Sequence, residues 1–303
     1  MRICHTISEL SLQAKVLTIG NFDGVHKGHQ TLLSRTIELA KAFQHESLVI
    51  TFWPHPRCVV SPSKTHCPIA TREKRLEYLA AFGIDCVLEL EFTRALASLS
   101  AECFVKDYLV PLNVKEMVTG YDFSLGRGRE GHTEELRLLG QKWGFSVEQM
   151  PPLYLEGNIV SSTRLRALLL QGDFVHANAL LGRYYELQGE VIHGCKRGRT
   201  LGFPTANLKK PITVLPSEGV YACYASLYGE KKQALLNIGH NPTFGDNPLS
   251  IECFLLDEER DLYGQTLDLA LVERVRGEKK FPDARALIEQ IHADIAKARD
   301  ILL

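Results

Sequence analysis

The stretch "LTIGNFDGVHKGHQTLL", residues 17–33, decides how the first half of the chain is interpreted. An apolar run leads into a turn, and the chain then continues with the periodicity of a helix. The turn carries three glycines and two histidines: Gly20, Gly24, Gly28, His26 and His29. Free N–H groups and the helix dipole attract anions at a helix start, and glycines let the backbone approach them closely. The stretch therefore predicts a strand, a phosphate-binding turn and a helix.

Two alternatives exist for the histidine pair considered alone. A bare H-x-x-H is more often a pair of ordinary surface histidines than a site. A zinc site needs further ligands, and no Cys or His cluster near the pair supplies them. The preceding strand, the following helix and the three glycines favour the phosphate-binding interpretation.

The pattern around this stretch predicts an α/β domain. Apolar runs at residues 15–20, 47–52, 85–90 and 116–123 alternate with helical periodicity, as in residues 30–43 and 71–82. Strands that alternate with helices are typical of a parallel sheet with crossover helices. We expect a Rossmann-like parallel sheet in this half.

The pattern changes after two short helices, "STRLRALLLQ" and "DFVHANALL", which end at Gly172 and Gly182. Successive strand-like runs without helices between them follow, and they predict an antiparallel β-barrel. A last helix begins near Pro282, and its apolar stripe should pack on the barrel. We therefore expect domains at residues 1–182 and 183–303.

Composition excludes several classes of protein. The 303 residues carry a net charge of −1 and ordinary apolar and charged fractions, so a general attraction to nucleic acid or anionic membranes is not expected. No signal peptide and no run long enough to cross a bilayer is evident, so we expect a cytoplasmic protein. The eight cysteines are scattered without a C-x-x-C pair, which predicts reduced and mostly buried thiols.

The residues "GNFDGVHKGH" resemble the nucleotidyltransferase signature G-x-F-D-x-x-H-x-G-H, in the form found in the bifunctional riboflavin kinase/FAD synthetase family. The resemblance implies that His26 and His29 cradle the ATP phosphates and take part in catalysis. It also implies nucleotide binding by the residues of the turn itself, which are Gly20, Asn21, Phe22, Asp23 and Gly24.

A second segment, "GYDFSLGRGREG" at residues 120–131, resembles the family's G-x-D-F-x-F-G-x-x-R-x-G, with Leu125 in place of the usual Phe. It implies that Asp122 lies near the nucleotide and the flavin phosphate. The segment also contains G-x-G-x-x-G, but a dinucleotide fingerprint should open the first strand-to-helix crossover, so we set that interpretation aside. Its two arginines, Arg127 and Arg129, fit an anion-handling loop.

A third segment, "SSTRLR" at residues 161–166, resembles the family's S-S-T-x-I-R. Hydroxyls that open a helix cap it and offer donors to an anion, and an arginine can contact phosphate oxygens with two parallel hydrogen bonds. A plain helix cap is the alternative. With the other motifs present, we expect nucleotide binding by Ser161, Ser162 and Thr163 and a catalytic role for Arg164.

The second half carries "GRTLGFPTAN", residues 198–207, which resembles the riboflavin kinase signature G-R-x-x-G-F-P-T-A-N. The preceding "KRGR" alone would be a solvated turn or a short nucleic-acid patch. The resemblance implies Mg²⁺ binding by Thr205 and Asn207. It implies nucleotide binding by the specified positions Gly198, Arg199, Gly202, Pro204, Thr205 and Asn207. No G-x-x-x-x-G-K-[ST] occurs, so a kinase here is not of the P-loop type.

Further on, residues 235–257 resemble the family's N-I-G-x-R-P-T-F and E-x-H-L-L-D segments, and Glu252 matches the catalytic glutamate. A solvent-facing strand glutamate is the alternative. The chain departs from the family pattern at Asn241, Cys253, Phe254 and Glu258. Closer to the end, Arg276 and Phe281 again match.

These motifs, in the family's order, imply one chain with two activities, phosphorylation of riboflavin to FMN and adenylylation of FMN to FAD, each with ATP and Mg²⁺. The rival interpretations are an enzyme with one active half, a flavin-binding regulator and an RNA-binding protein. We expect only small-molecule partners, ATP, riboflavin and FMN, and the sequence leaves homo-oligomerisation open.

Overall fold

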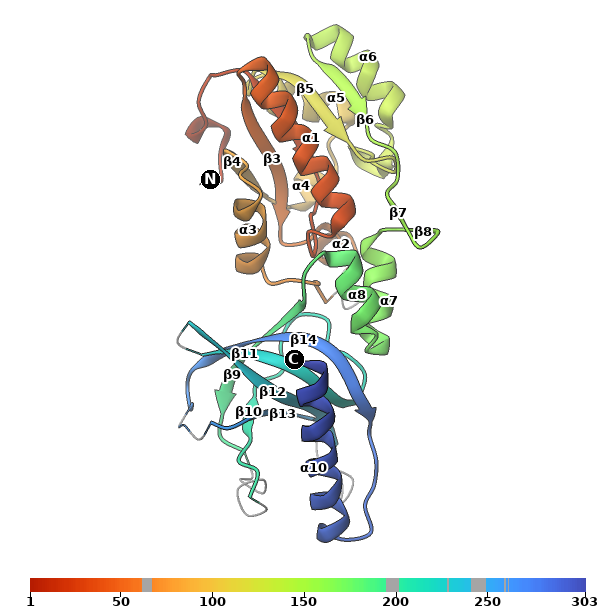
Figure 1. The fold of residues 1–303 in the computed structure, drawn as a ribbon. Helices are drawn as coiled ribbons and strands as arrows, with labels where there is room; N and C mark the ends of the chain where they lie inside the picture. The colour runs from red at the N-terminus through yellow and green to blue at the C-terminus, as the bar shows by residue number, and fades with distance from the viewer. Residues whose placement is uncertain (62–66, 195–201, 228, 241–248, 259, 261) are drawn as a thin grey trace. The chain divides into compact units, whose positions relative to one another are not determined.

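The computed structural model describes residues 1–61, 67–194, 202–227, 229–240, 249–258, 260 and 262–303 (Figure 1). It divides the chain into two compact units, Met1–Ser162 and Thr163–Leu303. The predicted boundary near Gly182 stays a prediction.

The first unit is built on a six-stranded parallel sheet in the order β1-β4-β3-β2-β5-β6, which confirms the predicted fold class. Its strands are β1 (Arg2–Cys4), β2 (Lys15–Ile19), β3 (Glu46–Trp53), β4 (Cys86–Glu91), β5 (Val114–Thr119) and β6 (Ser146–Gln149). All residues of β2 are buried. A strand covered on both faces is buried without alternation, and in β2 even Lys15 and Thr18 are fully buried. The short edge strands β1 and β6 were not predicted.

Helices cover both faces of this sheet (Figure 1). Packed on one face are α1 (Lys27–Phe43) and α3 (Arg72–Ala81), whose Leu33 and Leu79 share a core with Val49 and Val87 of the sheet. The opposite face packs against α5 (Ala101–Phe104), the π-helix η2 (Val105–Leu109) and α6 (Thr133–Trp143). Smaller elements are η1 (Ile7–Glu9), α2 (Pro56–Val60), α4 (Arg94–Ala97), η3 (Arg127–Arg129), β7 (Tyr154–Leu155) and β8 (Asn158–Ile159).

The second unit is a closed antiparallel barrel in the order β10-β13-β12-β11-β14-β9, as predicted. Its strands are β9 (Tyr185–Ile192), β10 (Ala206–Leu208), β11 (Gly219–Leu227), β12 (Glu230–Gly239), β13 (Ser250–Leu255) and β14 (Thr266–Gly277). Five were predicted as strand-like runs. The sixth, β10, has three residues and was not.

In the described part of the second unit, the helices are α7 (Ser162–Gln171), which begins at the last residue of the first unit, α8 (Phe174–Leu181) and α10 (Ala284–Ile301). Gly172 and Gly182 both have positive φ, 76° and 71°, which confirms them as left-handed helix ends. The apolar stripe of α10 packs on the barrel as predicted, with Ala298 in one core with Leu235 and Val220. Arg276 fixes the same helix by donating to the buried Asp294 carboxylate.

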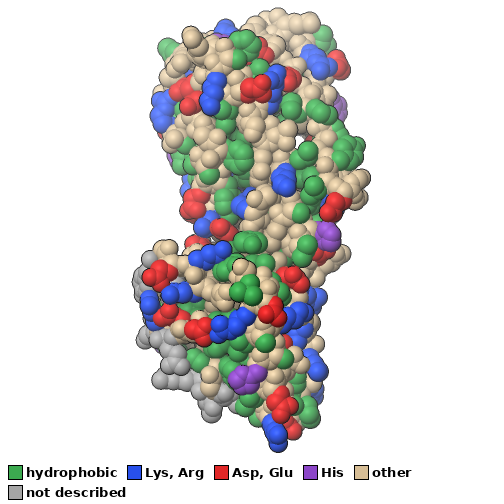
Figure 2. All heavy atoms as spheres, viewed as in Figure 1, with side chains coloured by type: hydrophobic (Ala, Val, Ile, Leu, Met, Phe, Trp, Pro, Cys, Tyr) green, Lys and Arg blue, Asp and Glu red, His purple; other side chains and the backbone are tan. Residues whose placement is uncertain are grey.

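Charged side chains of both signs are interspersed over the surface drawn in Figure 2. Four of the described cysteines are buried, Cys4, Cys86, Cys223 and Cys253, whereas Cys58, Cys67 and Cys103 are exposed. The prediction of mostly buried thiols therefore fails for those three. Among the described helices, none combines the length and the hydropathy needed to cross a membrane.

Candidate active sites

The first two predicted segments follow neighbouring strands of the parallel sheet. Gly20 comes directly after β2 and Gly120 directly after β5, and these strands pair with Thr18 opposite Val118. The strand order changes direction at β2, which has β3 on one side and β5 on the other. Ligands of such sheets bind outside the carboxyl ends of the strands at this point. The sheet therefore brings the histidine turn and the Asp122 loop to one edge.

The turn after β2 is strained and deeply buried. Phe22 and Val25 have φ angles of 48° and 40°, and both side chains are fully buried. Each residue held in this sparsely populated region costs about 1–3 kcal/mol, so the surroundings must hold the turn in place. The carboxylate of Asp23 does so by accepting the Ile69 N–H at 2.8 Å. Asp23 is thus a buried support of the turn.

Gly24 is required at its position for two reasons. Its φ is +79°, and a Cβ placed there would lie 2.7 Å from Ile69 Cγ2. A side chain would therefore meet both backbone strain and a steric clash. The glycine that the sequence assigned to phosphate approach also allows the turn to pack on Ile69.

His26 and His29 lie side by side as predicted, but one backbone N–H group at the start of α1 is bonded to a histidine side chain. His26 is the N-cap of α1, and its Nδ1 accepts the backbone N–H of His29 at 3.3 Å. The sequence assigned the free N–H groups of this turn to phosphate, and this one is occupied by the His26 cap instead. An accepting Nδ1 places the proton of neutral His26 on Nε2.

The two imidazoles stack, with centroids 3.7 Å apart and planes 13° from parallel. Burial lowers the pKa of His29 well below its usual value, and the neighbouring His26 lowers it further. His29 is therefore neutral near pH 7. Its Nδ1 is buried and has no hydrogen-bond partner among the described residues.

The third segment reaches the same turn through Ser162. Its hydroxyl donates to the backbone oxygen of Asp23 at 3.3 Å, and Gly28 packs close to the backbone oxygen of Val160. Ser161 directly precedes α7. Thr163 and Arg164 follow within α7 and belong to the second unit, so their predicted contact with the nucleotide stays a prediction.

The loop after β5 is closed by its own contacts. Leu125 and Gly131 exchange backbone hydrogen bonds of 2.9 Å, and Arg129 donates to Ser124 Oγ and to the Asp122 backbone oxygen. This use of Arg129 differs from the anion-handling role suggested by the sequence. Asp122 itself is exposed. The G-x-G-x-x-G within the loop lies in the crossover from β5 to α6, not in the first crossover.

In the barrel, a polar row crosses three adjacent strands. Glu252 of β13 pairs with Asn207 of β10 on one side and with Asn237 of β12 on the other. Directly opposed residues of neighbouring strands point to the same face of a sheet. This is the face covered by α10, because Phe254 and Leu235, two residues away from the row, pack against that helix. Asn237 was missed, although the "NIG" segment contains it.

Thr205 joins this row from the residue before β10. Its hydroxyl donates to Glu252 Oε2 at 3.2 Å. Gly194 lies against Asn207, since a Cβ at Gly194 would clash with the Asn207 side-chain amide. Three oxygen-bearing side chains therefore converge here, from Thr205, Asn207 and Glu252.

The remaining predicted residues of the second unit are placed as follows. Pro204 is half-buried, Gly202 is exposed with φ +87°, and Gly198, Arg199 and Asn241 lie outside the described residues. Phe203 makes edge contacts with Phe254 and His292. Cys253 faces the barrel core and Glu258 pairs with Lys232, so neither departure removes a member of the polar row.

Comparison with known proteins finds two family models in this chain. The FAD synthetase model matches residues 8–164 and the riboflavin kinase model matches residues 181–302. A bifunctional riboflavin kinase/FMN adenylyltransferase of Escherichia coli (strain K12) is 37% identical over 302 residues, covering 99% of this chain and 96% of the relative. One from Pseudomonas fluorescens is 39% identical over 286 residues, covering 94% and 92%.

Among solved structures, a chain from Streptococcus pneumoniae described as a macrolide-efflux protein superposes with a TM-score of 0.89 at 30% identity, covering 98% of both chains. The architecture is therefore shared over nearly the full length. With both domain models matched in order and relatives aligned end to end, this chain belongs to the bifunctional riboflavin kinase/FMN adenylyltransferase family.

Proposed function

We propose that the chain phosphorylates riboflavin to FMN in its second domain and adenylylates FMN to FAD in its first domain, with ATP as the donor in both steps. The observation that carries the proposal is the convergence of each family's motif residues within their own unit. In the first unit, Ser162 donates to the Asp23 backbone oxygen in the turn that carries the stacked histidines, and in the second unit Thr205 donates to Glu252.

In the first domain, an FMN phosphate oxygen attacks the α-phosphorus of ATP and pyrophosphate leaves. The step requires positioning and neutralisation of charge rather than a covalent enzyme intermediate. Neutral His29 and the Nε2–H of His26 act as hydrogen-bond donors to the phosphate oxygens. In our assignment, Arg164 supplies a positive charge to the phosphates, and Asp122 acts near the nucleotide and the flavin phosphate.

The turn residues bind the nucleotide in different ways. Gly20, Asn21 and Gly24 offer backbone, whereas Phe22 and Asp23 are buried and act by shaping that backbone. Ser161, Ser162 and Thr163 add hydroxyls at the start of α7. The Ser162 hydroxyl already donates to the Asp23 backbone oxygen, so it donates to a phosphate oxygen only after that hydrogen bond is exchanged.

In the second domain, Glu252 accepts the proton of the riboflavin 5′-hydroxyl as that oxygen attacks the γ-phosphorus of ATP, and ADP leaves. Glu252 is half-buried beside a hydroxyl and two amides, which can orient its carboxylate. Gly198, Arg199, Gly202 and Pro204 complete the nucleotide contacts in this assignment.

The second domain offers a suitable donor set for Mg²⁺. The cation prefers oxygen ligands, and Thr205 and Asn207 present a hydroxyl and an amide oxygen beside the Glu252 carboxylate. These two residues would hold the ion in our assignment. Mg²⁺ would neutralise charge on the ATP phosphates.

The proposal is tested by incubating the pure protein with riboflavin, ATP and Mg²⁺ and separating the flavins by chromatography over time. We expect FMN to appear first and FAD to follow, with neither formed when Mg²⁺ is chelated. Absence of both products would refute the proposal, and formation of FMN alone would refute its first-domain half.

A further inference from the structure

A buried ion pair lies beneath the histidine turn of the first domain and belongs to none of the recognised motifs. Arg75 of α3 and Glu89 of β4 are 4% and 3% exposed, and their side chains meet at 2.9 Å. A buried pair of charges persists only when its geometry and its further hydrogen bonds compensate for the lost hydration. The other hydrogen bonds of Arg75 and Glu89 therefore indicate the structural role of the ion pair.

One nitrogen of the Arg75 guanidinium donates to backbone oxygens near the turn. Its Nη1 donates to the carbonyl oxygen of Asn21 at 3.1 Å and to that of Phe52 at 3.2 Å. Asn21 is the second residue after β2, and Phe52 lies near the carboxyl end of β3. One guanidinium thus ties the turn to the neighbouring strand at the edge of the sheet where ligands bind.

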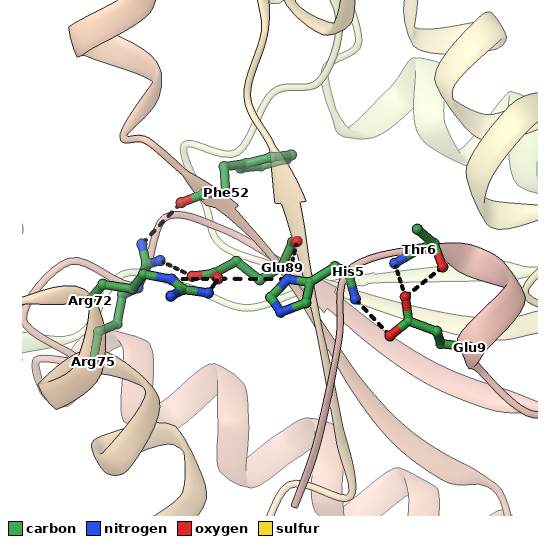
Figure 3. A network of polar contacts seen from close by, with 7 residues as sticks. All are labelled: His5, Thr6, Glu9, Phe52, Arg72, Arg75 and Glu89. Atoms are coloured by element: carbon green, nitrogen blue, oxygen red, sulfur yellow. Dashed lines mark hydrogen bonds and ion pairs between the residues drawn. The ribbon is translucent and has the colours of Figure 1, made fainter.

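Glu89 holds that guanidinium in place. Its Oε1 accepts from Arg75 and its Oε2 accepts from Nε of Arg72 at 2.7 Å. Figure 3 shows the two arginines of α3 converging on Glu89, with His5 on the other side. Burial lowers the pKa of Arg75, and the Glu89 carboxylate opposes this, which keeps the guanidinium charged.

The turn needs such a support because its backbone is strained. Phe22 and Val25 sit at positive φ between Asn21 and His26, so any relaxation of these angles rotates the start of α1. Asp23 fixes the turn on the Ile69 side, and Arg75 fixes it on the strand side. If either contact is removed, only the other one holds the strained residues of the turn in place.

We propose that Arg75 is a positioning residue for adenylyl transfer: oriented by the Glu89 carboxylate, it fixes the Asn21 and Phe52 carbonyls and so sets the direction in which the turn presents His26 and His29. The proposal rests on FMN adenylylation in this domain. Arg75 acts through the turn and needs no contact with ATP or FMN.

The test compares four variants by steady-state kinetics of FAD formation from FMN and ATP. Arg75→Ala is expected to lower kcat about 100-fold, since a displacement near 1 Å can cost that much. Glu89→Gln and Arg75→Lys, which keep much of the volume, should lower kcat by about tenfold, because each retains part of the network. Arg72→Ala is the matched control: Arg72 shares Glu89 but touches neither carbonyl, so its kcat should stay within about twofold of wild type.

A purely structural role is separated from positioning by two further readouts. FMN formation from riboflavin by the same molecules reports on the other domain, and it should stay unchanged in all four variants. Guanidinium ion added at millimolar concentration should restore FAD formation by Arg75→Ala at least fivefold, because it can occupy the vacated position.

The proposal is overturned if Glu89→Gln and Arg75→Lys retain the wild-type kcat for FAD formation. It is also overturned if kcat per folded molecule, with the folded fraction measured by circular dichroism, is unchanged in Arg75→Ala. A wild-type protein that forms no FAD would instead refute the proposed function of the domain.

Discussion

The two domains hold their candidate residues by different means. In the first, the histidine turn leaves regular structure after β2 and passes through two buried non-glycine residues at positive φ, supported by Asp23 and Arg75. In the second, Asn207, Glu252 and Asn237 stand opposite one another in regular strand pairing, and Thr205 enters from the adjoining residue. The first site therefore depends on long-range supports, and the second mainly on register.

This difference has a consequence for mutation. A site fixed by register should lose activity when the reacting group is removed and be tolerant of changes elsewhere, because the strands keep their pairing. A site fixed by a strained turn should be sensitive to residues that never meet a ligand. The variants below test this difference between the two sites, from the largest expected loss to the smallest.

The largest effect is expected for Glu252→Gln. The amide keeps the shape of the side chain but cannot accept the riboflavin proton, so the rate of FMN formation should fall about 1,000-fold. FAD formation from supplied FMN should stay within about twofold of wild type, since it takes place in the other domain. Glu258→Gln, which alters an ion pair with Lys232 in the same unit, is the control. Equal loss in both variants would contradict the assignment.

A smaller loss is expected for His29→Ala. Removing a donor to the phosphate oxygens should lower FAD formation about 100-fold and leave FMN formation unchanged. The assay is FAD formation at saturating ATP and FMN, with His45→Ala as a control on a histidine that follows the end of α1. If FMN formation falls together with FAD formation in a folded His29→Ala protein, the sites are assigned to the wrong domains.

Two glycine variants test the dependence on the strained turn. Gly24→Ala adds a methyl group 2.7 Å from Ile69 at φ +79°, and we expect a loss of about 3 kcal/mol in the free energy of unfolding together with loss of FAD formation. Gly83→Ala, at φ +84° with open space around it, should cost about 1 kcal/mol and leave activity intact. Denaturant melts of both variants give the comparison. Equal costs would show that the turn is not held against Ile69.

The smallest effect concerns pH. The pKa of His29 is lowered in the folded protein, so below about pH 6.5 the unfolded chain binds a proton that the folded chain does not. Stability should therefore fall as the pH drops through this range, by at most about 1.4 kcal/mol per pH unit from this residue. His29→Gln should reduce the slope between pH 6.5 and 5. An identical slope in both proteins would show that His29 titrates normally when folded.

Much of this arrangement is visible in the sequence. The α1 start and five of the barrel strands were predicted, because amphipathic and alternating periodicity are local signals. Motif spacing also singled out Glu252, whose catalytic role stays a prediction. Three-residue β10 was missed since it carries no periodicity, and only its pairing with β9 and β13 makes it a strand. The edge strands β1 and β6 were not predicted for a related reason: both are short, and β6 is only partly buried.

Other features could not be predicted because they arise from contacts between distant segments. Asp23 was expected at the nucleotide, but the fold brings Ile69 to its carboxylate. Arg75 and Glu89 are 14 residues apart and look like ordinary charged positions of a helix and a strand. The N-cap role of His26 depends on the backbone angles of the turn, which the sequence suggests only through its glycines.

The most direct test of two independent sites on one chain is complementation between single-site variants. His29→Ala and Glu252→Gln are each purified and incubated with riboflavin, ATP and Mg²⁺, separately and as an equimolar mixture, and FAD is measured by chromatography. We predict negligible FAD from either variant alone and FAD from the mixture at a rate comparable to wild type, since FMN released by one variant is adenylylated by the other. A mixture that forms no FAD, although His29→Ala makes FMN and Glu252→Gln adenylylates supplied FMN, would contradict free exchange between independent sites. A mixture that fails because either variant has lost both activities would contradict the separation of the two activities between the domains.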